Sequence, residues 1–134
     1  MIQKSETIGD LHKLLLVYRA ASDLNKHSLP DELVPHYLLF LGKLGGPTTY
    51  FSYYWDANGP RFKESPIRDL VECGDLASSD DKYHFLTPKG IKYTEELLTK
   101  TSEIYESIKI ILPHLTKIEN ELPFLSRLLP LIHD

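Results

Sequence analysis

Six side chains between positions 61 and 89 carry groups that bind phosphate. Five are basic and one is a hydroxyl: Arg61, Lys63, Ser65, Arg68, Lys82 and Lys89. Lysine and arginine neutralise the phosphates of a nucleic-acid backbone, and a hydroxyl with free backbone amides at a helix start adds hydrogen bonds to an anion. The chemistry that these residues indicate is therefore contact with double-stranded DNA.

The same segment is not basic overall. Between Ala57 and Lys92, six lysines or arginines are balanced by six aspartates or glutamates, and the whole chain has a net charge of −4. Asp80 and Asp81 lie at the tip of a predicted hairpin, where they repel phosphate. DNA binding must then depend on the placement of single charges, and binding to another protein is the alternative.

The sequence has no pattern typical of an enzyme. Its histidines are scattered without the spacing of metal ligands: His12, His27, His36, His84, His114 and His133. The single cysteine, Cys73, has no second thiol beside it, and we expect it to be a packed side chain. A Gly-x-Ser-x-Gly turn is missing, and the Gly-Gly-Pro-Thr segment lacks the lysine of a phosphate loop. We predict no catalytic activity, no metal and no cofactor.

The composition is typical of one folded domain. The chain has 134 residues, of which 42% are hydrophobic and 25% charged. No stretch approaches the roughly 18 apolar residues of a transmembrane helix, and the N-terminus lacks the apolar core of a signal peptide. A lone cysteine fits a reducing compartment. We therefore predict a cytoplasmic protein with no membrane contact.

Start and stop signals divide the N-terminal part into two helices. Ser5 or Thr7 can cap a helix whose apolar residues recur at spacings of three and four. The run Leu14–Val17 is broader than one stripe, so we expect this helix to be covered on more than one side. A second helix begins at Pro30 or Pro35 and ends at a Gly-Gly-Pro turn.

Aromatic and β-branched residues over 48–55 predict a strand, which a turn at 58–60 ends. We expect one face of this strand to lie in the core rather than to form a base-stacking platform. Its other face, near Gly45-Gly46-Pro47, is the candidate contact for an effector or a partner. Together with the hairpin that follows, the strand predicts a small antiparallel sheet of three strands.

The segment after the strand has the clearest helix signals. Ser65 as cap and Pro66 as first residue begin a short helix that ends at Gly74. Two apolar runs around a polar tip at 79–82 predict the hairpin. Thr87-Pro88 then begins a long helix. This order of elements is that of a winged helix-turn-helix: helix, helix, strand, short helix, hairpin and long helix.

Short motifs support this order. They are Tyr53-Tyr54-Trp55, Gly59-Pro60, Asp69-Leu70, Gly74-Asp75-Leu76 and Leu86-Thr87-Pro88-Lys89-Gly90. Over residues 31–92 the chain resembles winged-helix proteins of the YwgA-like group and, more loosely, PadR-like transcription regulators. It departs from the YwgA-like pattern at Arg61-Phe62-Lys63-Glu64, which separates Gly-Pro from the serine. The resemblance implies that the helix at 66–73 enters the major groove of DNA and that the region of Asp80 forms the wing.

The C-terminal part carries a seam of apolar residues that alternate spacings of three and four, as in a coiled coil. Its members are Leu97, Ile104, Ile108, Ile111, Leu115, Ile118, Leu122, Leu125 and Leu129. Burial of such side chains contributes roughly 1.5–3 kcal/mol each, so the seam must be covered. We expect helices kinked at Pro113 and Pro123 that pair with a second chain; the alternative is that they fold back on the first helix.

We therefore predict a mainly α protein with a small antiparallel β-sheet (α+β). Residues 1–92 form a winged-helix domain with an N-terminal helix, and residues 93–134 form long kinked dimerisation helices. The predicted function is that of a dimeric DNA-binding protein that regulates transcription. A non-catalytic adaptor or antitoxin-like module that binds another protein is the alternative.

Overall fold

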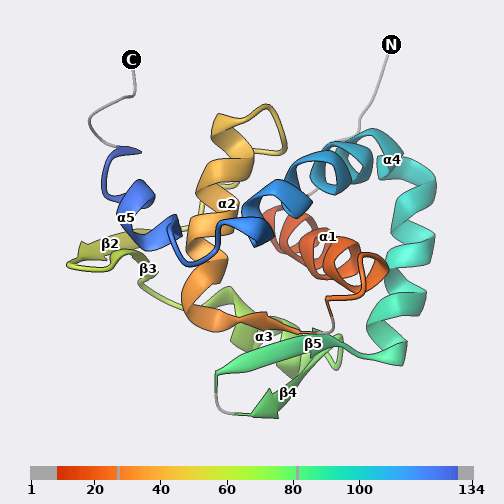
Figure 1. The fold of residues 1–134 in the computed structure, drawn as a ribbon. Coiled ribbons are helices and arrows are strands. Elements are labelled where there is room, and N and C mark those ends of the chain that lie inside the picture. Colours follow the sequence, from red (N-terminus) through yellow and green to blue (C-terminus); the bar gives the residue numbers. More distant parts are fainter. Residues whose placement is uncertain (1–8, 27, 81, 130–134) are drawn as a thin grey trace.

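The computed structural model describes residues 9–26, 28–80 and 82–129, and it is mainly helical with short antiparallel strands (Figure 1). The α+β class is therefore confirmed. The elements are α1 (Asp10–Asp23), β1 (Leu29–Pro30), the 3-10 helix η1 (Asp31–Leu33), α2 (Val34–Lys43), β2 (Tyr53–Asp56), β3 (Gly59–Phe62), α3 (Pro66–Glu72), β4 (Leu76–Asp80), β5 (Tyr83–Leu86), α4 (Pro88–Lys117) and α5 (Leu122–Ser126). The predicted caps Ser5 and Thr7, the hairpin residue Asp81 and residues 130–134 lie outside the described residues.

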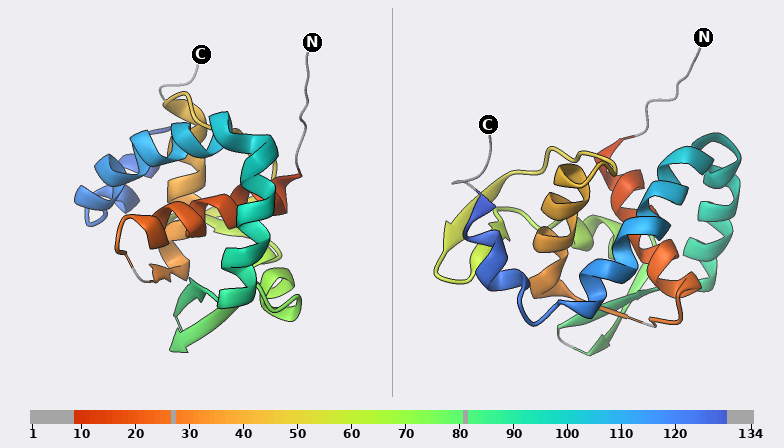
Figure 2. Two further views of the ribbon diagram at one scale, coloured as in Figure 1. Left: turned by 90° about the vertical axis from the view of Figure 1, so that its right-hand side faces the viewer. Right: turned by 45° about the horizontal axis from the view of Figure 1, so that its top comes forward.

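Helix α1 is the centre of the core. Five consecutive residues, Leu14–Tyr18, are each at most 2% exposed. Because an α-helix has 3.6 residues per turn, such a run points in every direction around the axis. α4, β5 and α3 all pack against α1 (Figure 2). The prediction that this helix is covered on more than one side is confirmed.

The strands form two sheets, and the predicted three-stranded sheet differs in one member: β1, and not the segment at 48–55, pairs with the hairpin. Three strands pair in the order β1-β5-β4, and β2 pairs with β3 alone. Strand β1 has only two residues, and an alternating sequence pattern cannot be recognised over so short a segment. Gly59-Pro60, predicted as part of a turn, begins β3, and the positive φ of 105° at Gly59 allows the chain to reverse there.

Only the end of the predicted strand at 48–55 is a strand. The preceding loop is held by side chains of α1 instead of by a neighbouring strand. Lys13 Nζ donates to the Thr48 carbonyl oxygen at 2.8 Å, and the Tyr50 backbone N–H donates to Asp10 at 3.1 Å. Backbone groups used in this way cannot also pair in a ladder, so β2 begins only at Tyr53.

Helix α4 bends at Thr101, where φ is −132° and ψ is 27°. The Thr101 hydroxyl donates to the Leu97 carbonyl oxygen at 2.8 Å, a back-bond to the preceding turn that often accompanies a bent helix. Pro113, where a kink was predicted, lies within α4, and the non-helical torsion angles of this helix are at Thr101 instead. Pro123 lies in the first turn of α5, where a proline needs no hydrogen-bond donor.

The bend returns the second half of α4 across α1 and α2 (Figure 2). This return covers most of the apolar seam within the same chain. Ile108 and Leu122 are 0% exposed, Leu115 is 2% and Leu129 is 5%. Leu97, Ile104, Ile111 and Leu125 are half-buried. The expectation that a second chain is needed to cover these residues is wrong, and the fold-back alternative describes them.

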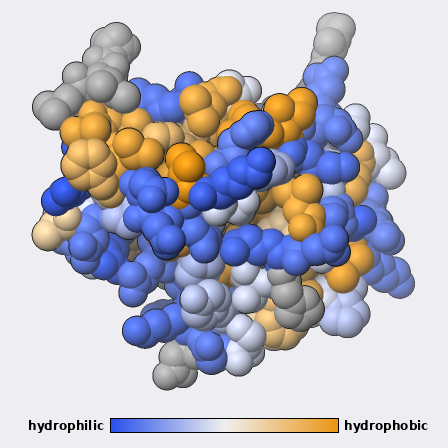
Figure 3. All heavy atoms as spheres, viewed as in Figure 1, coloured by the Kyte–Doolittle hydropathy of each residue, from blue (hydrophilic) through white to orange (hydrophobic). Residues whose placement is uncertain are grey.

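The predicted boundary at 92/93 falls inside α4, which continues across it without a break. The short helix α5 then packs beside α2 and β3. Ile118 is 37% exposed and Phe124 is 57% exposed. Apolar side chains gather over the region of α5 in Figure 3.

Candidate nucleic-acid interface

Helix α3 begins and ends where the sequence predicts. The Ser65 hydroxyl accepts a hydrogen bond from the Ile67 backbone N–H at 3.3 Å, Pro66 is the first helical residue, and Gly74 has a positive φ of 88°. The side that carries Ile67 and Leu70 is buried against the core. This burial leaves Arg68, Asp69 and Glu72 exposed on the outer side.

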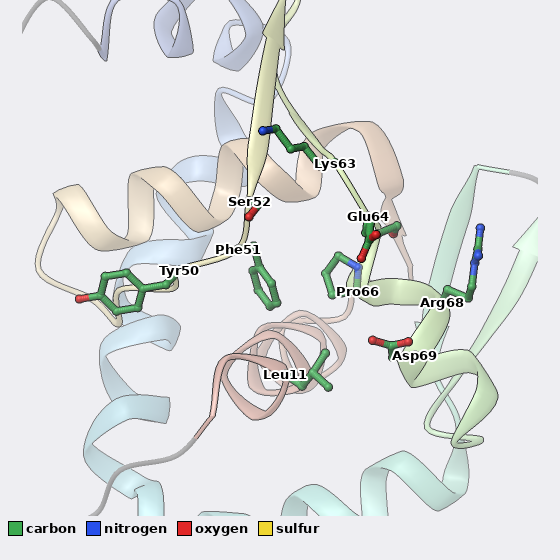
Figure 4. Close-up of a pocket in the computed structure, with 10 residues that line it drawn as sticks. Leu11, Tyr50, Phe51, Ser52, Lys63, Glu64, Pro66, Arg68 and Asp69 are labelled. Carbon is green, nitrogen blue, oxygen red and sulfur yellow. The ribbon is translucent and has the colours of Figure 1, made fainter.

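A groove of about 900 Å³ runs from the start of α3 to the loop before β2 (Figure 4). Its lining residues come from α1, from that loop and from the N-terminal end of α3: Leu11, Tyr50, Phe51, Ser52, Lys63, Glu64, Ser65, Pro66, Arg68 and Asp69. Leu11, Phe51 and Pro66 lie along the floor, whereas Lys63 and Arg68 extend at the rim. The groove therefore has an apolar floor and charged edges.

The electrostatics of this groove are mixed. Lys63 and Arg68 face the same space as Glu64 and Asp69. Within the described part of the chain, neither Lys63 nor Arg68 forms an ion pair. Both cations are thus available to an anion, but the two neighbouring carboxylates limit how many phosphates the groove can attract.

Three of the six predicted DNA contacts, Lys63, Ser65 and Arg68, meet in this groove. The other three lie apart from it. Arg61 on β3 is half-buried, with Nε 3.3 Å from a carboxylate oxygen of Asp56. Lys89 Nζ donates to the Cys73 carbonyl oxygen at the end of α3. Because Arg61 and Lys89 are held within the chain, the structure does not present them with the groove.

Lys82 follows the turn of the β4–β5 hairpin and lines a separate cavity of about 330 Å³. Glu32 and Glu119 line the same cavity, on η1 and after α4 respectively. Glu119 is already engaged, because it accepts a hydrogen bond from the Tyr37 hydroxyl at 2.9 Å and lies 3.4 Å from Lys26 Nζ. This cavity is therefore less suited to an anion than the groove beside α3.

Sequence reasoning missed most of the groove's lining. Leu11 belongs to a helix more than 50 residues before α3, and no spacing in the sequence relates the two. Tyr50 is 78% exposed, and the centroid of its ring lies 6.0 Å from Lys13 Nζ. The rings of Phe51 and Tyr53 lie 5.6 and 5.5 Å from that of Phe62, and both residues are half-buried. Trp55 on the same face is 45% exposed, so the prediction that one face of this strand lies in the core is wrong for its end.

A buried polar pair joins α2 to α5. His36 Nδ1 lies 2.6 Å from the Ser126 hydroxyl, and the two residues are 2% and 0% exposed. Burial, reinforced by the positive charge of Arg61, lowers the pKa of His36 to about 4. The neutral imidazole resembles the base of a serine nucleophile, but neither group can reach a substrate in this position. Its role here is to hold α5.

Among the residues that the structure describes, no three His, Cys, Asp or Glu side chains are grouped closely enough to hold a metal ion. In the same part of the chain, no helix has the length and apolar character needed to cross a membrane.

Comparison with known proteins gives no relative from which a role could be transferred: no family model matches the sequence, and no curated protein or solved structure is significantly similar to it.

Proposed function

We propose that this chain is a winged-helix DNA-binding protein that regulates transcription. The arrangement of its elements supports the proposal. α3 directly precedes the β4–β5 hairpin, and the order β1-β5-β4 joins a short strand between α1 and α2 to that hairpin. In a winged helix-turn-helix, the helix in the place of α3 is the one that enters the major groove.

A likeness of fold does not establish a function, so the residues must carry the argument. The single observation that carries it is the meeting of Lys63, Ser65 and Arg68 at the N-terminal end of α3. Both cations lie at the rim and lack ion pairs within the described residues. Two phosphates on one strand could therefore be neutralised while the outer side of α3 faces base edges.

The test is a titration of duplex DNA at several salt concentrations. We expect binding that weakens as salt rises, and Arg68→Ala should reduce affinity by about tenfold and lower the salt dependence by about one counterion. Lys100→Ala is the matched control, because Lys100 is an exposed lysine on α4, away from the groove. Equal losses in both variants, or weak binding to every sequence that neither variant changes, would contradict the proposal.

A protein-binding module on the same scaffold is the second candidate function. The observation that favours it is the charge of α3, where exposed Asp69 and Glu72 accompany the single cation Arg68. Carboxylates on the face that approaches DNA repel its phosphates, whereas they suit a basic protein surface. Recovery of one stoichiometric protein partner with no retained DNA would favour this candidate over the first.

A further inference from the structure

Strand β2 has an unpaired edge. It pairs only with β3, and this two-stranded hairpin extends from the body of the molecule beside α5 (Figure 1). The Lys63 backbone N–H donates to the Ser52 carbonyl oxygen at 3.0 Å, which sets the alternation of the ladder. The backbone N–H and C=O groups of Tyr54 therefore face β3, and the backbone N–H and C=O groups of Tyr53 and Trp55 face away from β3. No described residue pairs with those outward backbone groups.

The edge of β4 differs from that of β2. β4 ends the three-stranded sheet, and its ladder is interrupted by a register shift between Ser78 and Asp80. Such bulges and polar residues protect an edge against pairing with another chain. Strand β2 has no such register shift, and its one charged residue, Asp56, lies beside the turn. Its Tyr54 and Trp55 are 49% and 45% exposed.

We infer that the free edge of β2 binds β2 of a second copy of this chain, in antiparallel orientation about a two-fold axis. The alternation of hydrogen bonds requires that outward-facing residues of the two copies lie opposite one another. We place Tyr53 opposite Trp55 of the second copy, because the outward groups of both residues in both copies then exchange hydrogen bonds. The axis passes beside Tyr54, which faces its own counterpart with Cα atoms about 4.5 Å apart.

The side chains in this register are complementary to themselves. Aromatic residues lie opposite aromatic residues at all three central positions, and such cross-strand pairs stabilise antiparallel sheets. The only charged residue of β2, Asp56, lies opposite Ser52 rather than a second carboxylate. A strand that paired with a different protein would not need this self-complementarity, which is why we assign the edge to a second copy.

The resulting interface joins two hairpins into one four-stranded sheet. Each β2 has four residues, so the aromatic side chains must supply much of the free energy of association. We expect a dimer in the micromolar range rather than a permanent one. This pairing is independent of the proposed DNA binding, and it leaves the C-terminal seam buried within each chain.

The experiment measures molecular mass against protein concentration by sedimentation. The wild-type chain should pass from monomer to dimer with rising concentration. Tyr54→Lys and Tyr54→Glu should each raise the dimer dissociation constant about tenfold or more, because each places two like charges face to face. An equimolar mixture of the two variants should restore the dimer, since the ammonium group of one variant then faces the carboxylate of the other across the axis.

Phe124→Lys is the matched control, because Phe124 is an equally prominent exposed aromatic residue but lies on α5. It should leave the mass unchanged. The only tryptophan of the chain, Trp55, gives a second measurement: its emission should shift to the red on dilution of the wild type, and stay red-shifted at all concentrations in Tyr54→Lys.

Three results would overturn the inference. They are a wild-type chain that stays monomeric at high micromolar concentration, a dimer that Tyr54→Lys leaves intact, and a mixture of the two charged variants that fails to associate. Capture of an extended segment of a different protein on a monomer would likewise replace the second copy as the occupant of β2. None of these results bears on DNA binding by α3, which the titration tests separately.

Discussion

His36 shows how burial changes the chemistry of one residue. Its ring is enclosed between α2, β3 and α5, and a Cβ atom placed on Gly59 would come within 2.8 Å of it. The lowered pKa means that the ring is neutral in the folded chain under ordinary conditions. A neutral ring can keep its hydrogen bonds to Ser126 and to the Leu122 backbone without bringing a second positive charge beside Arg61.

This shift makes stability depend on pH. The folded pKa of about 4 lies below the ordinary value of 6.5, so the unfolded chain binds more protons than the folded one between these values. The free energy of unfolding should therefore fall as the pH falls through this window, by about 3 kcal/mol, and the contribution of His36 should be constant below it.

Urea unfolding at about pH 7 and about pH 4 checks this prediction through the variant His36→Gln, which cannot be protonated. The stability advantage of the wild type over this variant should be larger at the higher pH. His114→Gln provides the matched control at an exposed histidine. An advantage of the wild type that is independent of pH would rule out His36 as the source.

At the scale of elements, the segment from Leu86 to Gly90 connects the end of α3, the strand β5 and the start of α4. The Thr87 hydroxyl accepts a hydrogen bond from the Gly90 backbone N–H at 3.0 Å and donates to the Gly74 carbonyl oxygen at 2.6 Å. One threonine thus caps α4 and also holds the end of α3. The Leu-Thr-x-x-Gly motif therefore has a physical cause: it fixes α3 relative to the hairpin and to α4.

Gly90 completes this junction because its backbone lies against that of Asp75. A Cβ atom at position 90 would lie within 3.0 Å of the Asp75 carbonyl oxygen and of the Leu86 side chain. Gly90→Ala should therefore lower the free energy of unfolding by about 1–3 kcal/mol, since part of the contact is with backbone that cannot move aside freely. Thermal or urea unfolding measures this loss.

Gly9→Ala is the control for this glycine, because a Cβ atom there would meet nothing within 4 Å. It should change stability by far less than Gly90→Ala. If the two alanine variants are equally stable, the close approach of α4 to Asp75 does not constrain the junction.

For the whole molecule, the direction of the C-terminal chain decides which surfaces are free. The bend at Thr101 places the second half of α4 over α1 and α2, so the seam completes the core of a single chain. The exposed aromatic residues of β2 then remain as a surface for association.

The fold-back can be tested with two isoleucines on the same helix. Ile108 is 0% exposed and Ile110 is 67% exposed. Ile108→Ala should lower the free energy of unfolding by about 2–5 kcal/mol at protein concentrations where the chain is monomeric, whereas Ile110→Ala should have little effect. Unfolding followed at several concentrations makes the measurement.

A loss in Ile108→Ala that appears only where the chain associates would mean that a second chain covers the seam. A loss of the same size in Ile110→Ala would mean that the outer side of α4 is buried after all. The expected result is a concentration-independent loss that is confined to Ile108.

The sequence by itself determined the boundaries of the elements with strong local signals. Ser65 with Pro66, Gly74, and Thr87 with Pro88 mark the ends of helices α3 and α4 as predicted. These signals are readable because a cap or a left-handed turn satisfies backbone groups only a few residues away. Three of the six predicted phosphate-binding residues, Lys63, Ser65 and Arg68, lie together in one groove because all three lie close to the first residue of α3.

Tertiary structure alone decided the rest. The strand β1, the bend at Thr101 and the meeting of Leu11 with the start of α3 depend on contacts between residues far apart in the chain. The pattern of an apolar seam indicates only that the seam is buried. The free energy gained by its burial is the same whether a second chain or the same chain covers it. Whether the same chain or a second chain covers the seam depends on how the whole chain packs, and no local sequence pattern indicates this.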